Sequence, residues 1–182
     1  MCNCSRGLYV GRFQPFHNGH LECVKYVLGK CKEIIIVVGS AQASHTFENP
    51  FTAGERIEMI RLALQESGID LSKCIIIPVE DTLNNNHSIW VSKVRSMTPK
   101  FDVVFSNSPL TRKLFEEEGF KVEGLPYINR EHYSGKNIRK LIVSGEDWRK
   151  FVPRSVYDYI KLIKGEERLR DLSKRDYACQ SF

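Results

Sequence analysis

Short apolar runs alternate with longer amphipathic stretches along this chain of 182 residues. A short apolar run indicates a buried strand, whereas apolar positions spaced three or four residues apart indicate a helix. On this basis strands are predicted at residues 8–10, 34–38, 74–79, 102–105 and 120–122. Helices are predicted at about 17–30, from 52 onward, and at 87–97, 108–119, 134–143, 153–163 and 166–174.

Capping residues mark the ends of two of these helices. Thr52-Ala53-Gly54-Glu55 has the S/T-x-x-E spacing of a capping box. Ser108-Pro109 is an N-cap residue followed by proline at the first helical position, and Gly119 stands where a glycine would end that helix. These signals support helix boundaries independently of the apolar pattern.

The regular alternation of strands and helices predicts the fold class. Such an order is typical of a parallel sheet covered by helices on both faces. We expect an α/β, Rossmann-like, doubly wound sheet of five parallel strands in a single domain. The core would span about residues 7–145, a helical C-terminal extension about 146–175, and a tail 176–182. Ligands of such sheets bind at the carboxyl ends of the strands.

The composition is that of a globular protein, with 42% hydrophobic and 27% charged residues. The longest aliphatic run, Ile34–Val38, is far too short to span a membrane, and no apolar stretch follows Met1 as in a secretory signal. We therefore expect a cytoplasmic protein with no membrane partner. The cysteines show no C-x-x-C pair, so reduced thiols are expected. They are Cys2, Cys4, Cys23, Cys31, Cys74 and Cys179.

The net charge of +5 arises in the last third of the chain. Residues 130–182 carry 13 Lys and Arg against eight Asp and Glu, whereas residues 1–129 carry 14 of each. A basic C-terminal third suits a polyanionic ligand such as nucleotide phosphates or nucleic acid. A solvated helical face is the alternative.

The first candidate site is the stretch Gly11–His20, which leaves the first strand and enters the first helix. His17 and His20 are three residues apart and share one helix face, near free backbone N–H groups. Together with Arg12 and Gly19 they predict a site for a phosphate chain. Zinc would need a third ligand that the sequence does not indicate, and two structural histidines are a further alternative. G-x-G-x-x-G and G-x-x-x-x-G-K-[ST] are both absent, which disfavours a dehydrogenase or a P-loop kinase.

The second candidate site is Tyr133–Arg139, at the start of a helix in the basic third. Ser134 is a good N-cap residue, and Arg139 falls one turn into the helix. An arginine there could bind phosphate oxygens with two parallel hydrogen bonds. A capped helix with a surface arginine is the alternative.

These two motifs carry a resemblance to a known superfamily. The H-x-G-H pattern resembles the nucleotidyltransferases, which share it with class I aminoacyl-tRNA synthetases, and Gly11–His20 as a whole is similar to adenylyltransferases that build dinucleotide cofactors. The second motif resembles the superfamily signature that binds the β and γ phosphates of ATP. Ser134, Ile138 and Arg139 match it, and Lys136 stands where the family usually has threonine.

A more specific resemblance runs from about residue 7 to residue 172. The segment from Ser40 to Arg56 is similar to the archaeal type of nicotinamide-mononucleotide (NMN) adenylyltransferase. This resemblance implies that Trp90 stacks on the nicotinamide ring and that Asp81 lies nearby; without it, Trp90 between Ile89 and Val91 is a core residue. The residues implied in NMN binding are Phe13, Ser40, Gln42, Asp81 and Trp90.

The same resemblance implies an adenosine side to the site. Ser106-Asn107-Ser108 stands where relatives commonly have Ser-Gly-Asn, and Glu48 occupies a loop position where some relatives carry arginine. The residues implied in ATP binding are Gly11, Arg12, Phe13, His17, Gly19, His20, Ser106, Asn107, Ser134, Ile138 and Arg139.

The expected activity is transfer of AMP from ATP to NMN, giving NAD and pyrophosphate. His17, His20, Arg12 and Arg139 would be catalytic. Mg²⁺ would be the cofactor, held mainly by substrate phosphates and not by a protein site. The resemblance also implies a homo-oligomer, commonly a hexamer.

Three other functions stay open. The first is a sister adenylyl- or cytidylyltransferase that uses phosphopantetheine or FMN. The second is a nucleotide sensor without turnover. The third is a nucleic-acid-binding module, for which interleaved aromatic residues are lacking, so no nucleic-acid partner is expected.

Overall fold

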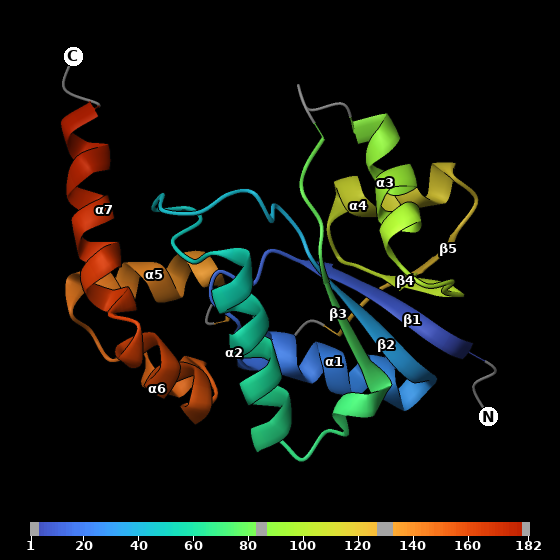
Figure 1. The fold of residues 1–182 in the computed structure, drawn as a ribbon, viewed down its shortest axis with the longest axis horizontal. Coiled ribbons are helices and arrows are strands. Elements are labelled where there is room, and N and C mark those ends of the chain that lie inside the picture. Colours follow the sequence, from blue (N-terminus) through green and yellow to red (C-terminus); the bar gives the residue numbers. More distant parts are fainter. Residues whose placement is uncertain (1–3, 83–86, 127–132, 180–182) are drawn as a thin grey trace. The chain divides into compact units, whose positions relative to one another are not determined.

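The computed structural model describes residues 4–82, 87–126 and 133–179 (Figure 1). Its internal contacts divide the chain into two compact units. Unit one comprises residues 1–12, 22–42 and 70–127, and unit two comprises residues 13–21, 43–69 and 128–182. The predicted division into a core of 7–145, an extension of 146–175 and a tail stays a prediction.

Unit one contains a parallel sheet, which in the described residues has five strands in the order β3-β2-β1-β4-β5 (Figure 1). The chain builds outward from β1 in one direction and then returns to build β4 and β5 on the other side. This is the doubly wound topology, and it confirms the predicted fold class. The strands are β1 (Cys4–Gly11), β2 (Cys31–Val38), β3 (Cys74–Pro78), β4 (Val103–Phe105) and β5 (Lys121–Glu123).

Helices pack on both faces of this sheet. On one face Tyr26 of α1 (Asn18–Lys30) contacts Phe105, with ring centroids 6.3 Å apart, and Val27 lies against Gly7. On the other face α3 (Trp90–Met97) and α4 (Pro109–Glu117) cover an apolar cluster. The cluster comprises Leu8, Ile35, Val37, Val79, Trp90, Val91, Val94, Phe101, Val104 and Phe115. The two-residue alternation of side chains along each strand produces this division.

Strands β1 and β2 begin earlier than the apolar pattern predicts. β1 begins at Cys4 instead of Leu8, and β2 begins at Cys31 instead of Ile34. The added residues include an ion pair between Arg6 and Glu33, which face each other in the strand register. A charged cross-strand pair stabilises the start of these two strands but interrupts the apolar run that marks a strand in sequence.

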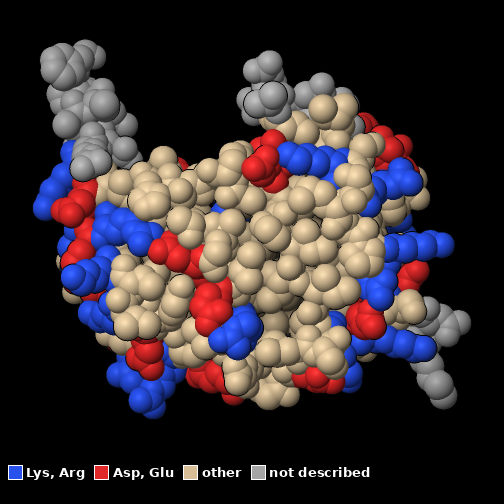
Figure 2. Space-filling model, viewed as in Figure 1, with Lys and Arg blue, Asp and Glu red and all other residues tan. Residues whose placement is uncertain are grey.

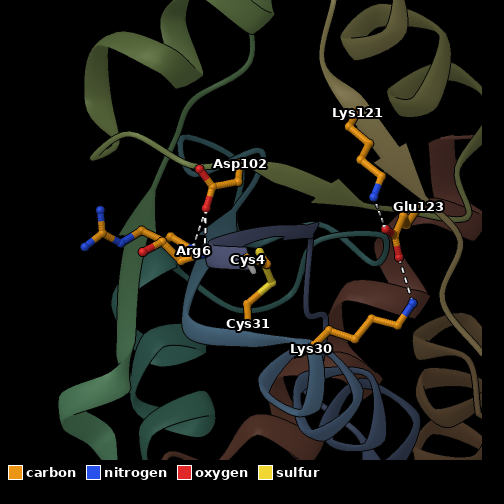
Figure 3. The surroundings of a disulfide bond; sticks show 8 residues. Cys4, Arg6, Lys30, Cys31, Asp102, Lys121 and Glu123 are labelled. Atoms are coloured by element: carbon orange, nitrogen blue, oxygen red, sulfur yellow. Dashed lines mark hydrogen bonds and ion pairs between the residues drawn. A yellow bond between two sulfur atoms is a disulfide. The ribbon is translucent and has the colours of Figure 1, made fainter. Parts of the chain in front are cut away.

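The same register produces a disulfide between Cys4 and Cys31 (Figure 3). The prediction of reduced thiols is therefore wrong for these two cysteines, whereas Cys23 and Cys74 are free. Parallel pairing places the first residues of β1 and β2 side by side, with Cα atoms 4.6 Å apart, although they are 27 residues apart in sequence. Cys2 and the side chain of Cys179 lie outside the described residues.

Unit two contains α2 (Ala53–Glu66), α5 (Gly135–Ser144), α6 (Arg154–Leu162) and α7 (Gly165–Cys179). The predicted capping box of α2 is confirmed, since Thr52 and Glu55 each bond the other's backbone N–H. Arg168 of α7 makes two bonds of 2.7 Å to the Glu55 carboxylate and so ties α7 to the start of α2. Among the residues that the structure describes, three short 3-10 helices are added: η1 (Leu71–Lys73) and η3 (His87–Ile89) in unit one, and η4 (Arg149–Phe151) in unit two.

The basic residues of the C-terminal third lie among acidic ones. Arg154 and Lys161 of α6 and Arg168, Arg170 and Lys174 of α7 each form an ion pair. The viewed face of these helices shows Lys and Arg interspersed with Asp and Glu (Figure 2). This arrangement favours the solvated helical face over a uniform basic patch. Within the described residues, no helix combines the length and the apolar character that a membrane span requires.

Candidate active site

The residues singled out from the sequence fall into two groups, one in each unit. The group in unit one is Gly11, Arg12, Ser40, Gln42, Asp81, Trp90, Ser106 and Asn107. The group in unit two is Phe13, His17, Gly19, His20, Ser134, Ile138 and Arg139.

Unit one holds a pocket of about 440 Å³ at the carboxyl ends of its strands. Five of the predicted residues line it: Gly11, Arg12, Ser40, Asp81 and Trp90. Gly11 ends β1, and Gly39 follows β2 and donates its N–H to the Gly11 carbonyl at 2.9 Å. The sheet thus places the pocket where a doubly wound fold binds its ligands. Further lining residues are Thr82, His87, Ser108, Leu110, Thr111 and Leu114.

Gln42 holds Asp81 at the wall of this pocket. The amide oxygen of Gln42 accepts the Asp81 backbone N–H at 3.0 Å, and its Nε2 donates to the Asp81 carboxylate at 3.2 Å. The neighbouring Ala41 N–H is bonded to the Val79 carbonyl at 3.1 Å. Gln42 is therefore a residue that positions Asp81 rather than one that lines the pocket.

Trp90 belongs both to the pocket and to the apolar core. Its side chain is buried, and its ring meets the Phe115 ring edge-on with centroids 5.9 Å apart. Among the described residues its buried Nε1–H has no hydrogen-bond partner. The two interpretations of Trp90 from sequence are thus compatible, because one side chain serves both environments.

Ser106 and Asn107 make contacts to the backbone around them. The Asn107 amide accepts the Leu125 N–H and donates to the Leu125 carbonyl, both at 2.9 Å. Ser106 is buried, and its hydroxyl accepts the Ser108 N–H at 3.1 Å. Neither residue lines the pocket, whereas Ser108 does. Their role in binding ATP stays a prediction.

The H-x-G-H turn in unit two pairs its two histidines face to face. The rings of His17 and His20 are stacked with centroids 3.5 Å apart. Each histidine's backbone N–H approaches the other's Nδ1 at 3.3 Å. Because a backbone N–H can only donate, both Nδ1 atoms are acceptors, and the proton of each neutral ring is assigned to Nε2.

Burial keeps both rings neutral. It lowers the pKa of His17 to about 3 and holds the pKa of His20 well below its usual value, with a further contribution from His17. The edge of the Phe13 ring packs on His20 with centroids 4.8 Å apart. A Cβ at Gly19 would lie only 3.0 Å from the Cβ of Tyr133, so glycine allows this close packing. The turn presents two uncharged N–H donors at physiological pH.

Arg139 lies one turn into α5, as predicted, and its side chain is only 3% exposed. It donates to the Gln14 carbonyl at 2.8 Å and to the Glu48 carboxylate at 2.8 Å. Ser134 caps the helix by accepting the Asn137 N–H at 3.2 Å. A Cβ at residue 135 would lie 2.7 Å from the Gln14 oxygen, so Gly135 lets the start of α5 approach that carbonyl.

Two residues of unit two that contact Arg139, Gln14 and Glu48, are not predicted as site residues from the sequence. Gln14 is buried, and its amide bonds both the N–H and the carbonyl of Phe51, at 3.0 and 2.8 Å. Glu48 was considered only as a departure from relatives, yet its carboxylate is the partner of Arg139. Neither contact has a local sequence signal, because the partners of Arg139 are 125 and 91 residues away from it.

The described residues were compared with the ligand sets that hold metal ions in proteins. Across residues 4–82, 87–126 and 133–179, no cluster of three His, Cys, Asp or Glu side chains could hold a metal ion. His17 and His20 are two adjacent imidazoles that could be considered as metal ligands, but their Nδ1 atoms already accept backbone N–H groups. The histidine pair therefore supplies two of the three or four protein ligands that a zinc site uses.

A doubly wound sheet with an H-x-G-H turn after its first strand is the arrangement expected of a nucleotidyltransferase, and the comparison with protein families shows this class. Residues 8–141 match the family described as cytidylyltransferase-like, which is more than half of the chain. The chain therefore belongs to this family.

Proteins of similar sequence show which group of nucleotidyltransferases the chain belongs to. A nicotinamide-nucleotide adenylyltransferase of Saccharolobus solfataricus is 54% identical over 172 residues, covering 94% of this chain and 99% of the relative. One of Archaeoglobus fulgidus is 54% identical over 176 residues, with the same coverage. Within the cytidylyltransferase-like family, the chain belongs to the nicotinamide-nucleotide adenylyltransferases.

Solved structures agree with the fold. A bifunctional NMN adenylyltransferase/ADP ribose pyrophosphatase from Francisella tularensis has a TM-score of 0.82 at 22% identity. The match covers 97% of this chain and 55% of that one. The same protein complexed with AMP and manganese ion has a TM-score of 0.78 at 23% identity.

Proposed function

We propose that this protein transfers AMP from ATP to nicotinamide mononucleotide and releases NAD and pyrophosphate. The observation that carries the chemistry is the stacked pair of neutral imidazoles in the H-x-G-H turn. The choice of acceptor is supported by the names of relatives that are about half identical over nearly the whole chain.

The reaction needs no nucleophile from the protein. An oxygen of the NMN 5′-phosphate forms a bond to the α-phosphorus of ATP. The bond from that phosphorus to the bridging oxygen breaks, and pyrophosphate leaves with the electron pair. The attacking phosphate is ionised at neutral pH, so no base is required. The protein must bind, align and stabilise charge.

The histidine pair supplies charge stabilisation at the α-phosphate. The Nε2–H groups of His17 and His20 donate hydrogen bonds to its non-bridging oxygens, and the bonds strengthen as negative charge grows there. Since both rings are already neutral donors, the pair gives up no proton during the step. Fixed backbone contacts to Nδ1 hold the rings in one orientation.

The two arginines bind the phosphates of the substrates, and the pocket of unit one binds the nicotinamide nucleotide. Arg139 binds the β- and γ-phosphates and stabilises the departing pyrophosphate, and Arg12, at the pocket of unit one, binds phosphate there. Asp81 and Trp90 of the same pocket bind the nicotinamide nucleotide, the indole by stacking on the pyridinium. Mg²⁺ would enter as part of the MgATP substrate, held by phosphate oxygens and water. The ion would offset the negative charge of the phosphates.

The test is pyrophosphate release from MgATP with one acceptor at a time. The acceptors are NMN, its acid form, FMN and phosphopantetheine. Release with the nicotinamide nucleotide alone, with NAD formed in step, supports the proposal. Release only with FMN or phosphopantetheine would keep His17, His20 and Arg139 in their roles and overturn those of Asp81 and Trp90. ATP binding with no release from any acceptor would indicate a sensor.

Assembly into a homo-oligomer is also proposed, on the resemblance to archaeal-type enzymes alone. The mass of the protein in solution, measured by light scattering after gel filtration, tests it. A monomer mass of 21.0 kDa at micromolar concentration would refute it.

A further inference from the structure

The two partners of the ion pair between Glu48 and Arg139, in unit two, differ in their exposure to solvent. The Arg139 side chain is 3% exposed, whereas that of Glu48 is 57% exposed. Arg139 Nη2 donates to Glu48 Oε2 at 2.8 Å, and the guanidinium carbon lies 5.6 Å from the centre of the Phe47 ring. A buried guanidinium is therefore covered by two neighbouring side chains of one irregular segment.

That segment, residues 43–50, is anchored to other elements at its end, whereas its tip is a turn that bonds to itself. At the end, Arg168 donates to the Pro50 carbonyl at 3.1 Å, and Gln14 bonds Phe51 in both directions. The tip is a turn in which Asn49 accepts from Thr46 at 3.3 Å and donates to its hydroxyl at 3.0 Å.

Within the described residues, the buried Oδ1 of Asn49 has no hydrogen-bond partner. An unsatisfied buried acceptor raises the free energy of this turn. Because the Glu48 side chain is 57% exposed, it can leave Arg139 by rotating into solvent while the turn and the anchored end stay in place.

We propose that Glu48 is an internal counter-anion, which the triphosphate of ATP must displace from Arg139, and that Glu48 thereby sets the affinity for ATP. This inference rests on the proposed function, in which Arg139 binds the β- and γ-phosphates. A phosphate that approaches Nη2 meets the Glu48 carboxylate at the same donor group, and the two anions repel each other, so they compete for Arg139.

The exposure of the two partners explains why the exchange is feasible. Arg139 keeps an anion in either state, so its buried charge is never left without one. Glu48 is mostly in solvent and loses little when it is displaced. Its charge is the feature that opposes binding, so removing the charge while keeping the shape favours the triphosphate.

The test measures binding of inorganic tripolyphosphate and of ATP by calorimetry. The wild type is compared with Glu48→Gln and with the control Glu167→Gln, which removes the same charge from an exposed position on the first turn of α7. Glu48→Gln is expected to bind both ligands roughly two- to fivefold more tightly, as displacing an exposed ion-pair partner implies. Glu167→Gln is expected to match the wild type, and KM for NMN is expected to stay unchanged in both variants.

The same comparison in an Arg139→Gln protein tests whether Glu48 acts through Arg139. In Arg139→Gln the gain from Glu48→Gln should vanish, and a gain that persists there would overturn the proposal. Unchanged or weaker tripolyphosphate binding by folded Glu48→Gln would overturn it as well. Failure of the proposed function is distinguishable, because a protein that releases no pyrophosphate with NMN still reports on tripolyphosphate binding.

Discussion

The two imidazoles of the H-x-G-H turn owe their protonation state to contacts within the turn. Backbone N–H groups occupy both Nδ1 atoms, and burial disfavours the charged rings. The sequence predicts the pairing through the spacing of His17 and His20. The stacking and the tautomer follow only from the turn geometry, which depends on Gly19 and on the packing of Phe13.

Replacing His20 should impair catalysis more than folding. In His20→Ala the loss of one preorganised donor is expected to lower kcat by roughly 10²-fold or more. Steady-state pyrophosphate release measures this, with unfolding followed in parallel. His45→Ala is the matched control, because His45 is exposed and outside the stacked pair. Turnover by His20→Ala within a few-fold of the wild type would contradict the assigned role.

The low pKa of His17 predicts a pH dependence of stability. The folded-state pKa of about 3 lies below the unfolded value near 6.5, so between these values the unfolded state binds the extra proton. The neutral histidine therefore costs nothing above pH 6.5, and stability is lost as pH falls from 6.5 toward 3, by up to about 1.4 kcal/mol per pH unit.

Denaturant unfolding at a series of pH values from 4 to 8 tests this. His17→Gln, which does not titrate, should show a shallower decline than the wild type below pH 6.5. Identical slopes for the two proteins would mean that His17 does not have the depressed pKa.

At the scale of elements, the apolar pattern predicts which strands and helices exist better than where they end. Capping residues at Thr52 and Ser108 place two helix starts correctly. The 3-10 helices add single turns that three residues cannot signal by periodicity. The early starts of β1 and β2 depend on cross-strand partners, which only the register of the sheet brings together.

The disulfide should stabilise the β1–α1–β2 unit. Its two cysteines enclose α1 and the H-x-G-H turn in a loop with a sequence separation of 27, for which loop entropy gives a contribution of about 3 kcal/mol. Cys4→Ser/Cys31→Ser is therefore expected to lower the free energy of unfolding by about that amount. Reductant should have the same effect on the wild type and none on the double variant. Cys74→Ser is the control, and an equal loss in it would mean that the effect is not due to the bond.

At the scale of the molecule, sequence alone predicts the doubly wound sheet and the location of ligand-binding residues at strand ends. It does not predict how Arg139 is held, because Gln14 and Glu48 meet it through the fold of unit two. Trp90 is ambiguous from sequence for a related reason, since one buried side chain lines the pocket and packs in the core.

The roles proposed for Trp90 and Arg139 predict a division of substrate binding between these two residues. Trp90→Leu, in unit one, should raise KM for NMN roughly tenfold and leave KM for ATP nearly unchanged, since leucine keeps apolar bulk but cannot stack. Arg139→Gln, in unit two, should raise KM for ATP and spare that for NMN. Initial rates with each substrate varied in turn measure both constants. Equal changes in the two constants for either variant would contradict this division.

The burial that keeps His17 and His20 neutral also bears on the direction of the reaction. A general acid or base ends the proton-transfer step in the opposite protonation state and must regain or lose a proton before it acts again. Imidazoles that only donate hydrogen bonds are the same before and after the transfer. We therefore expect the same pair to stabilise the transition state of NAD cleavage by pyrophosphate as well as that of NAD formation. The ratio of product to substrate concentrations, compared with the equilibrium constant, then decides the net direction.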